Sequence, residues 1–214
     1  MNASEAYARL QRLGVPIVAT TDAAEVLSQS VGAANKTLGR LAASSLVTPV
    51  ARGVWALTRE IDPWLVPEYL TAPLPSYVSL QTALHHHAMI EQIPAITYVV
   101  SLARTRRLQT RVGTFSIHRV APELFGGFDV LASGAKMASP EKALVDLLYL
   151  SATRNRMFAA LPELELPPRF DRRACAAWMA RITSPTLAKA VEVRFAAAMA
   201  RARTARSGRR ATRR

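Results

Sequence analysis

The sequence is poor in cysteine and in long apolar runs. Its single cysteine, Cys175, allows no internal disulfide and no thiol-rich zinc site, which agrees with a reducing compartment. The longest stretch without a formal charge, Tyr69 to Ile90, contains two prolines and three histidines, whereas a membrane span needs roughly 20 continuous apolar residues. The first residues lack the basic and apolar parts of a secretory signal. These absences predict a cytoplasmic protein without membrane contact.

Acidic residues are also scarce. The 214 residues include 28 Lys and Arg but 15 Asp and Glu, for a net charge of +13. Residues 201–214 alone hold seven arginines and no acidic residue. Such a tail attracts phosphate groups without sequence preference, so the net charge says little about the folded body. Half of the residues are apolar, which is enough for a core in one or two domains.

The N-terminal part has the pattern of a DNA-binding module. A cap at Thr21 or Asp22 begins the second of three expected helices, and β-prone runs on both sides of Ala51–Gly53 predict a hairpin with glycine at its tip. This order predicts a winged helix-turn-helix domain over residues 1–60. The three helices share apolar positions at helical spacing and cover about Ser4–Leu13, Ala23–Leu27 and Ala33–Ala43.

The third helix and the hairpin carry the candidate DNA-binding residues. The apolar residues of this helix share one face, so small, polar and basic side chains point outward. An α-helix fits the major groove, where Asn, Lys and Arg can meet base edges, while a wing touches the backbone. We therefore predict DNA contacts from Asn35, Lys36, Thr37 and Arg40 on the helix and from Arg52 on the hairpin. The alternative is a structural three-helix module with an ordinary solvated face.

Residues 61–75 contain four prolines and are expected to be a linker. A second domain over residues 76–205 and a flexible basic tail over 206–214 follow. The fold class predicted for the whole chain is α+β, with a smaller sheet in the second domain. The elements expected there are a helix over about Leu80–Met89, strands over Ala95–Ser101 and Arg111–Val120 that pair antiparallel around a turn at Arg104–Arg107, and C-terminal helices beginning after Ser139, Asp171 and Ser184.

Residues with catalytic potential have simpler explanations. His85, His86 and His87 point roughly 100° apart in a helix, so they cannot share a metal ion. Cys175 lies in an alanine-rich helix and is predicted to be buried and inert. Glu141 and Lys142 are adjacent in a first helical turn, where we assign them to helix capping. The sequence therefore predicts no catalytic residue, no metal site and no cofactor.

Four segments of the second domain have a recognisable pattern. They are YVSLQTALHHHAMIEQIP, ITYVVSLARTRR, GTFSIHRV and, most specifically, ASPEKALVDLLYL. Together with the upstream order of helix-turn-helix, hairpin and prolines, they resemble the AbiEi family of antitoxins over about residues 5–150. The resemblance implies an antitoxin whose N-terminal domain represses its own operon at inverted repeats, with a possible homodimer on DNA. It also implies a second domain that neutralises a nucleotidyltransferase-type toxin, directly or indirectly.

Two other functions stay open at this point. One is a stand-alone winged-helix repressor whose second domain dimerises or senses a ligand. The other is an enzyme such as a nuclease. For ASPEKALVDLLYL we favour a structural role, in which Ser139 caps the helix, Pro140 opens it and Glu141 suits its positive end.

Overall fold

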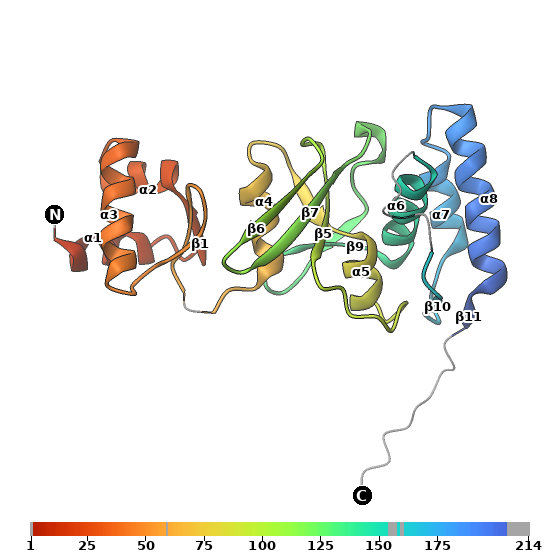
Figure 1. The fold of residues 1–214 in the computed structure, drawn as a ribbon, viewed down its shortest axis with the longest axis horizontal. Helices are drawn as coiled ribbons and strands as arrows, with labels where there is room; N and C mark the ends of the chain where they lie inside the picture. The colour runs from red at the N-terminus through yellow and green to blue at the C-terminus, as the bar shows by residue number, and fades with distance from the viewer. Residues whose placement is uncertain (1, 59, 154–157, 159–160, 205–214) are drawn as a thin grey trace, which may run out of the picture.

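The computed structural model describes residues 2–58, 60–153, 158 and 161–204. Helices and strands are mixed along the chain, which confirms the α+β class. N-terminal helices lie at one end, a central sheet follows, and further helices lie at the opposite end (Figure 1). Among the described residues, no helix combines the length and apolar character needed to span a bilayer. The basic tail expected at 206–214 lies outside the described residues.

Three helices form the N-terminal end. Asn2 caps the first helix by accepting a hydrogen bond from Glu5 N at 2.7 Å. The caps expected for the second helix, Thr21 or Asp22, are wrong, because that helix begins at Thr20, after Ala19, and has no side-chain cap. Ser30 caps the third, and buried residues such as Leu38 join the helices in one core. The helices are α1 (Ala3–Gln11), α2 (Thr20–Leu27) and α3 (Val31–Ala43).

A small antiparallel sheet packs beside these helices. It has the order β1-β3-β2, and its β2–β3 hairpin lies where the sequence predicts one. Gly53 has a φ of 76°, a left-handed conformation that glycine adopts without strain. Its carbonyl accepts a hydrogen bond from Thr20 N at 2.9 Å, which holds the hairpin turn at the start of α2. The strands are β1 (Ile17–Ala19), β2 (Thr48–Ala51) and β3 (Val54–Ala56).

The proline-rich segment is not an unstructured linker. It forms η1 (Pro63–Leu65) and α4 (Val66–Thr71), because Pro63 and Pro67 stand in first helical turns, where their missing N–H costs nothing. Tyr69 Oη donates a hydrogen bond to Ile17 O at 3.0 Å. One buried cluster joins this segment to both sheets. Its members include Ile17, Val50, Val66, Leu70, Val99, Phe115 and Ile117.

This packing predicts where the chain can be cut. A chain that begins at residue 61 keeps α4 over the central sheet, whereas one that begins at Pro73 loses Val66 and Leu70 from the buried cluster. Burial of each such side chain contributes about 1.5–3 kcal/mol. We expect the longer chain to have the higher free energy of unfolding in urea. Equal stability of the two chains would show that α4 is dispensable for the second part of the fold.

The central sheet is larger than expected. It has six strands in the order β6-β7-β5-β4-β9-β8. The antiparallel partner of β7 is β6, a strand that occupies half of the turn expected at Arg104–Arg107. The expected antiparallel pairing of Ala95–Ser101 with Arg111–Val120 is wrong, because β5 pairs with β7 in parallel. Leu108 of β6 packs against the buried cluster next to α4, which favours a strand there. The strands are β4 (Ser76–Val78), β5 (Thr97–Ser101), β6 (Arg106–Thr110), β7 (Gly113–Arg119), β8 (Phe128–Val130) and β9 (Lys136–Ala138).

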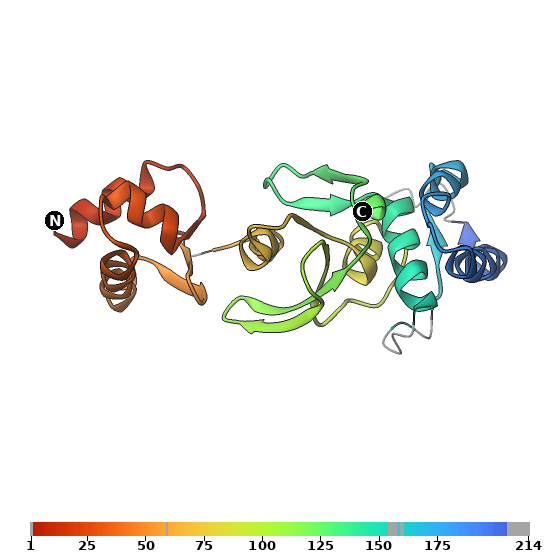
Figure 2. The ribbon, with the colours of Figure 1, turned by 90° about the horizontal axis from the view of Figure 1, so that it is seen from above.

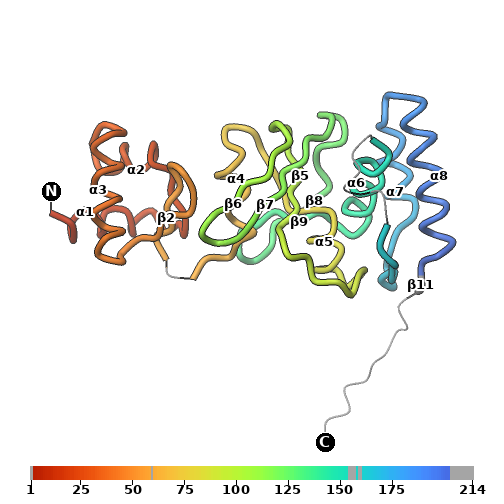
Figure 3. The backbone as a smooth tube through the Cα atoms, in the orientation of Figure 1, coloured from red at the N-terminus to blue at the C-terminus, as the bar shows by residue number. Residues whose placement is uncertain are grey.

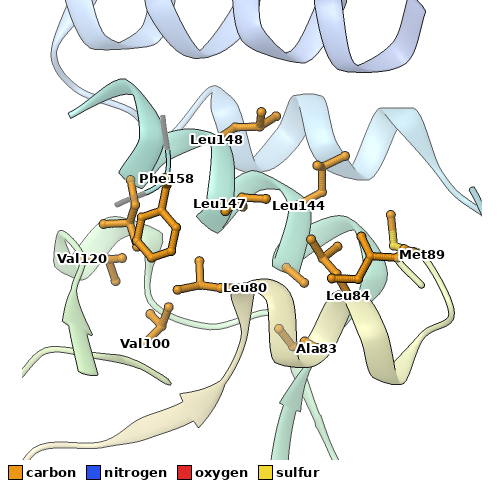
Figure 4. Packing of buried hydrophobic residues seen from close by; sticks show 14 of the residues in the cluster. Leu80, Ala83, Leu84, Met89, Val100, Val120, Leu144, Leu147, Leu148 and Phe158 are labelled. Carbon is orange, nitrogen blue, oxygen red and sulfur yellow. The ribbon is translucent and has the colours of Figure 1, made fainter. Parts of the chain in front are cut away.

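Helices cover the sheet and complete the opposite end of the molecule (Figures 2 and 3). Ser139, Asp171 and Ser184 cap α6, α7 and α8 as predicted. The largest core lies between α5 and α6, where labelled leucines of both helices gather (Figure 4). The remaining elements are α5 (Leu80–His86), η2 (Pro122–Leu124), α6 (Pro140–Ala152), β10 (Glu165–Leu166), α7 (Arg172–Met179), α8 (Pro185–Arg201) and β11 (Arg203–Thr204).

Candidate nucleic-acid interface

Helix α3 has one buried face and one exposed face. Leu38 and Leu41 have no exposed surface, because their spacing turns both toward the N-terminal core. Asn35, Lys36 and Arg40 are exposed, as the sequence predicts. The exposed face therefore offers one amide and two cations on a regular helix.

Thr37 differs from the other candidates because it is buried. Only 4% of its surface is exposed, so the expected direct contact with DNA does not fit its position. Its Oγ1 donates a hydrogen bond to Gln29 Oε1 at 3.1 Å and accepts one from Arg40 Nη2 at 3.3 Å. Thr37 thus holds the guanidinium of Arg40 against the helix.

A shallow hollow lies along the exposed face of α3. Its volume is about 670 Å³, and small residues separate the cations at its rim. A Cβ atom placed on Gly39 would meet no other atom within 4 Å. Glycine in a helix interior costs about 1 kcal/mol relative to alanine. Gly39 therefore leaves the surface of α3 open to a contacting molecule at the expense of helix stability. The lining residues are Gln29, Ala33, Lys36, Thr37, Gly39, Arg40 and Ala43.

Two hairpins lie next to one another beside this helix. Arg52 is exposed in the β2–β3 turn. Arg111 N, in the β6–β7 turn, donates a hydrogen bond to Val50 O of β2 at 3.3 Å. Both views place α3 and the β6–β7 hairpin on the same side of the molecule (Figures 1 and 2). Arg52 and Arg111 are thus exposed in two neighbouring turns, which adds cations outside α3.

The arginines of the β6–β7 hairpin were missed by the sequence prediction. Between Glu91 and Glu123 the sequence contains five arginines and no acidic residue, a signal that disappears when charge is averaged over the domain. All five are exposed. The guanidinium of Arg106 also donates a hydrogen bond to Leu70 O. The five are Arg104, Arg106, Arg107, Arg111 and Arg119.

A buried polar cluster at α6 was also missed. Lys142 has no exposed surface, and Asp146, with 1% exposed, pairs with it one helical turn away. The Nζ of Lys142 donates to Tyr77 Oη at 2.8 Å, and Asp146 Oδ2 accepts from Ser79 Oγ at 2.8 Å. The assignment of Lys142 to helix capping is therefore wrong, although Ser139 does cap α6. The signal in the sequence that could have revealed this pair is the spacing of four residues between Lys142 and Asp146, within an apolar stripe of the helix.

Helix α7 covers this cluster. The ring of Trp178 lies 4.9 Å from Lys142 Nζ, and a Cβ on Gly127 would come within 2.6 Å of the same ring. Burial raises the pKa of the Asp146 carboxyl, an effect that the nearby Lys142 charge opposes. Because the charged groups are enclosed by packed side chains, we assign them to the attachment of α6 and α7 to the sheet.

The histidine triplet and the cysteine have separate packing roles. His86 packs edge-on against Trp64, with ring centroids 5.1 Å apart, and His87 Nε2 lies 2.7 Å from Ala138 O. Within the described ranges, no three His, Cys, Asp or Glu side chains are grouped to hold a metal ion. Burial raises the pKa of the Cys175 thiol to about 12, so this thiol stays protonated at neutral pH.

Comparisons with known proteins give no family for this chain. It matches no model of a known protein family and no curated protein.

Proposed function

We propose that this protein is a DNA-binding transcriptional regulator of the winged helix-turn-helix type. Helix α3 enters the major groove and the β2–β3 hairpin is the wing. The observation that carries the proposal is the exposed face of α3, where Asn35, Lys36 and Arg40 surround or adjoin an open hollow. These side chains have the hydrogen-bonding groups that recognise adenine and guanine in the major groove.

The hairpins contact the sugar-phosphate backbone in this proposal. Arg52 and Arg111 are exposed in two turns that a backbone hydrogen bond holds together. Contacts with phosphates fix the register of a protein on DNA without selecting a sequence. Arg52→Ala is therefore proposed to weaken specific and non-specific binding alike.

The resemblance to AbiEi antitoxins supports a second part of the proposal. The protein represses its own operon at inverted repeats as a homodimer, and its second domain neutralises a nucleotidyltransferase-type toxin. The buried leucines of α6 support a structural role for the ASPEKALVDLLYL segment within that domain. Co-expression with the product of the adjacent gene tests antitoxicity through the recovery of cell growth. Growth arrest that persists despite operator binding would favour a stand-alone repressor.

Lys36→Ala and Arg40→Ala are expected to weaken binding to a selected DNA duplex. Each change removes a side-chain donor that contacts base edges, which should weaken the free energy of binding by roughly 1–3 kcal/mol. Fluorescence anisotropy with a duplex selected from random sequences measures the dissociation constants. Thermal unfolding should stay unchanged, because both side chains lie outside the buried face of α3.

Lys189→Ala provides the matched control. Its side chain is 78% exposed on α8, and the change removes the same single charge. We expect this variant to bind the selected duplex like the unaltered protein. An equal loss of affinity from Lys189→Ala would mean that total charge drives binding, and retained affinity in the Lys36→Ala/Arg40→Ala double variant would contradict a role for α3.

A further inference from the structure

A row of side chains crosses three neighbouring strands of the central sheet. Tyr98 on β5 is the register partner of Ser116 on β7, and Ser116 is the partner of Arg107 on β6. Register partners in a sheet place their side chains on the same face. Tyr98 and Arg107 therefore point to one side of the sheet, the side opposite the cluster around Phe115.

A pocket of about 510 Å³ opens beside this row. Tyr98 and Arg107 contribute from the sheet, and Gln81 contributes from α5. The volume lies within the range of sites that bind small molecules, roughly 300–1,000 Å³. The other lining residues come from the loop before β5 and from the segment before β10, and they are Ile90, Gln92, Pro94, Ala95, Ile96, Leu161 and Pro162.

Two polar groups in the pocket wall have no partner in the described part of the chain. Gln81 Oε1 is shielded from solvent and accepts no hydrogen bond from any described residue. A shielded acceptor without a donor is energetically unfavourable, so a donor from a bound molecule would be favourable after a small rotation of the amide. Arg107 is exposed, and no carboxylate of a described residue lies within 4 Å of its guanidinium.

The ring of Tyr98 offers a surface between these polar groups. Tyr98 is half-buried. The ring of His118 stacks against it with centroids 6.2 Å apart, and the ring of Phe158 packs edge-on with centroids 5.8 Å apart. A fixed aromatic ring favours planar ligands, because stacking then costs little side-chain entropy. Ile90, Ile96 and Leu161 add apolar surface to the pocket wall.

We propose that this pocket binds a small molecule with a planar ring and an anionic group. The ring stacks on Tyr98, an N–H of the ring or of its amino substituent donates to Gln81 Oε1, and the anion pairs with Arg107. Nucleoside monophosphates carry all three features, and aromatic carboxylates with an amino group are the smaller alternative. Binding at this pocket does not depend on the proposed recognition of DNA by α3.

Isothermal titration of the full chain with the four common nucleoside monophosphates and with 4-aminobenzoate tests the proposal. We expect at least one of these compounds to bind with a dissociation constant below about 1 mM. Inorganic phosphate alone and the matching nucleoside without phosphate should bind at least tenfold more weakly. If one of the five compounds binds, its identity shows which anion the pocket accepts. If none of them binds, the assignment is overturned.

Three variants locate the binding. Arg107→Ala is expected to weaken it about tenfold or more, since a charge-assisted hydrogen bond is lost, whereas Arg119→Ala, an exposed arginine outside the pocket, should not. Gln81→Leu should abolish the preference for a ring donor without destabilising the fold, because Oε1 has no described partner to lose. Equal effects of Arg107→Ala and Arg119→Ala would overturn the proposal in favour of non-specific attraction to basic residues.

Discussion

Lys142→Met is expected to lower the free energy of unfolding by about 3–5 kcal/mol, because it leaves the buried carboxylate of Asp146 without its cation. Asp146 has 1% of its surface exposed, so water cannot replace the lost partner. Methionine has a similar length and keeps most of the packing against Trp178. Urea denaturation followed by circular dichroism measures the change.

The double variant Lys142→Met/Asp146→Asn separates charge from packing. In the unaltered protein, the hydroxyls of Tyr77 and Ser79 donate hydrogen bonds to Asp146 Oδ2. Asparagine keeps an oxygen acceptor for these hydroxyls but carries no charge. Removal of a complete buried ion pair is often close to neutral, so the double variant should recover most of the lost stability. A single variant as stable as the unaltered protein would show that the ion pair contributes nothing.

Leu147→Ala is expected to cost about 2–5 kcal/mol, the range for removing a large aliphatic side chain from a core. Leu147 has no exposed surface and lies in the cluster between α5 and α6 (Figure 4). Val193→Ala on α8, where the side chain is 60% exposed, should stay within about 0.5 kcal/mol. Thermal and urea unfolding of the two variants make the comparison.

The same pair of variants tests the proposed role of the ASPEKALVDLLYL segment. If α6 is structural, the proposed antitoxicity should fall together with thermal stability in Leu147→Ala. Loss of that activity at a temperature where the variant is fully folded would contradict a purely structural role for the segment.

Local patterns predicted the helices well. The caps at Ser139, Asp171 and Ser184 are confirmed, because a cap depends on residues within one turn of the helix start. The exposed positions of Asn35 and Lys36 follow from helical periodicity in the same way. These predictions needed no knowledge of distant contacts.

Features that depend on distant contacts were not predictable in this way. The parallel pairing of β5 with β7 and the packing of α4 on two sheets join residues far apart in the sequence. The pattern of Arg106–Thr110 has few apolar residues, so the strand there depends on its place at the sheet edge and on the packing of Leu108. Thr37 looked like a surface residue, yet Gln29 and Arg40 enclose its hydroxyl.

The most direct test of the account is binding to a duplex in which 7-deazapurines replace the purines of the selected site. This change removes the N7 acceptors from the major groove and leaves base pairing intact. If Lys36 and Arg40 on α3 contact these edges, the substituted duplex should bind the unaltered protein about tenfold or more weakly. The Lys36→Ala/Arg40→Ala variant should then bind both duplexes with the same low affinity. Equal affinity of the unaltered protein for the two duplexes would contradict recognition through the major groove.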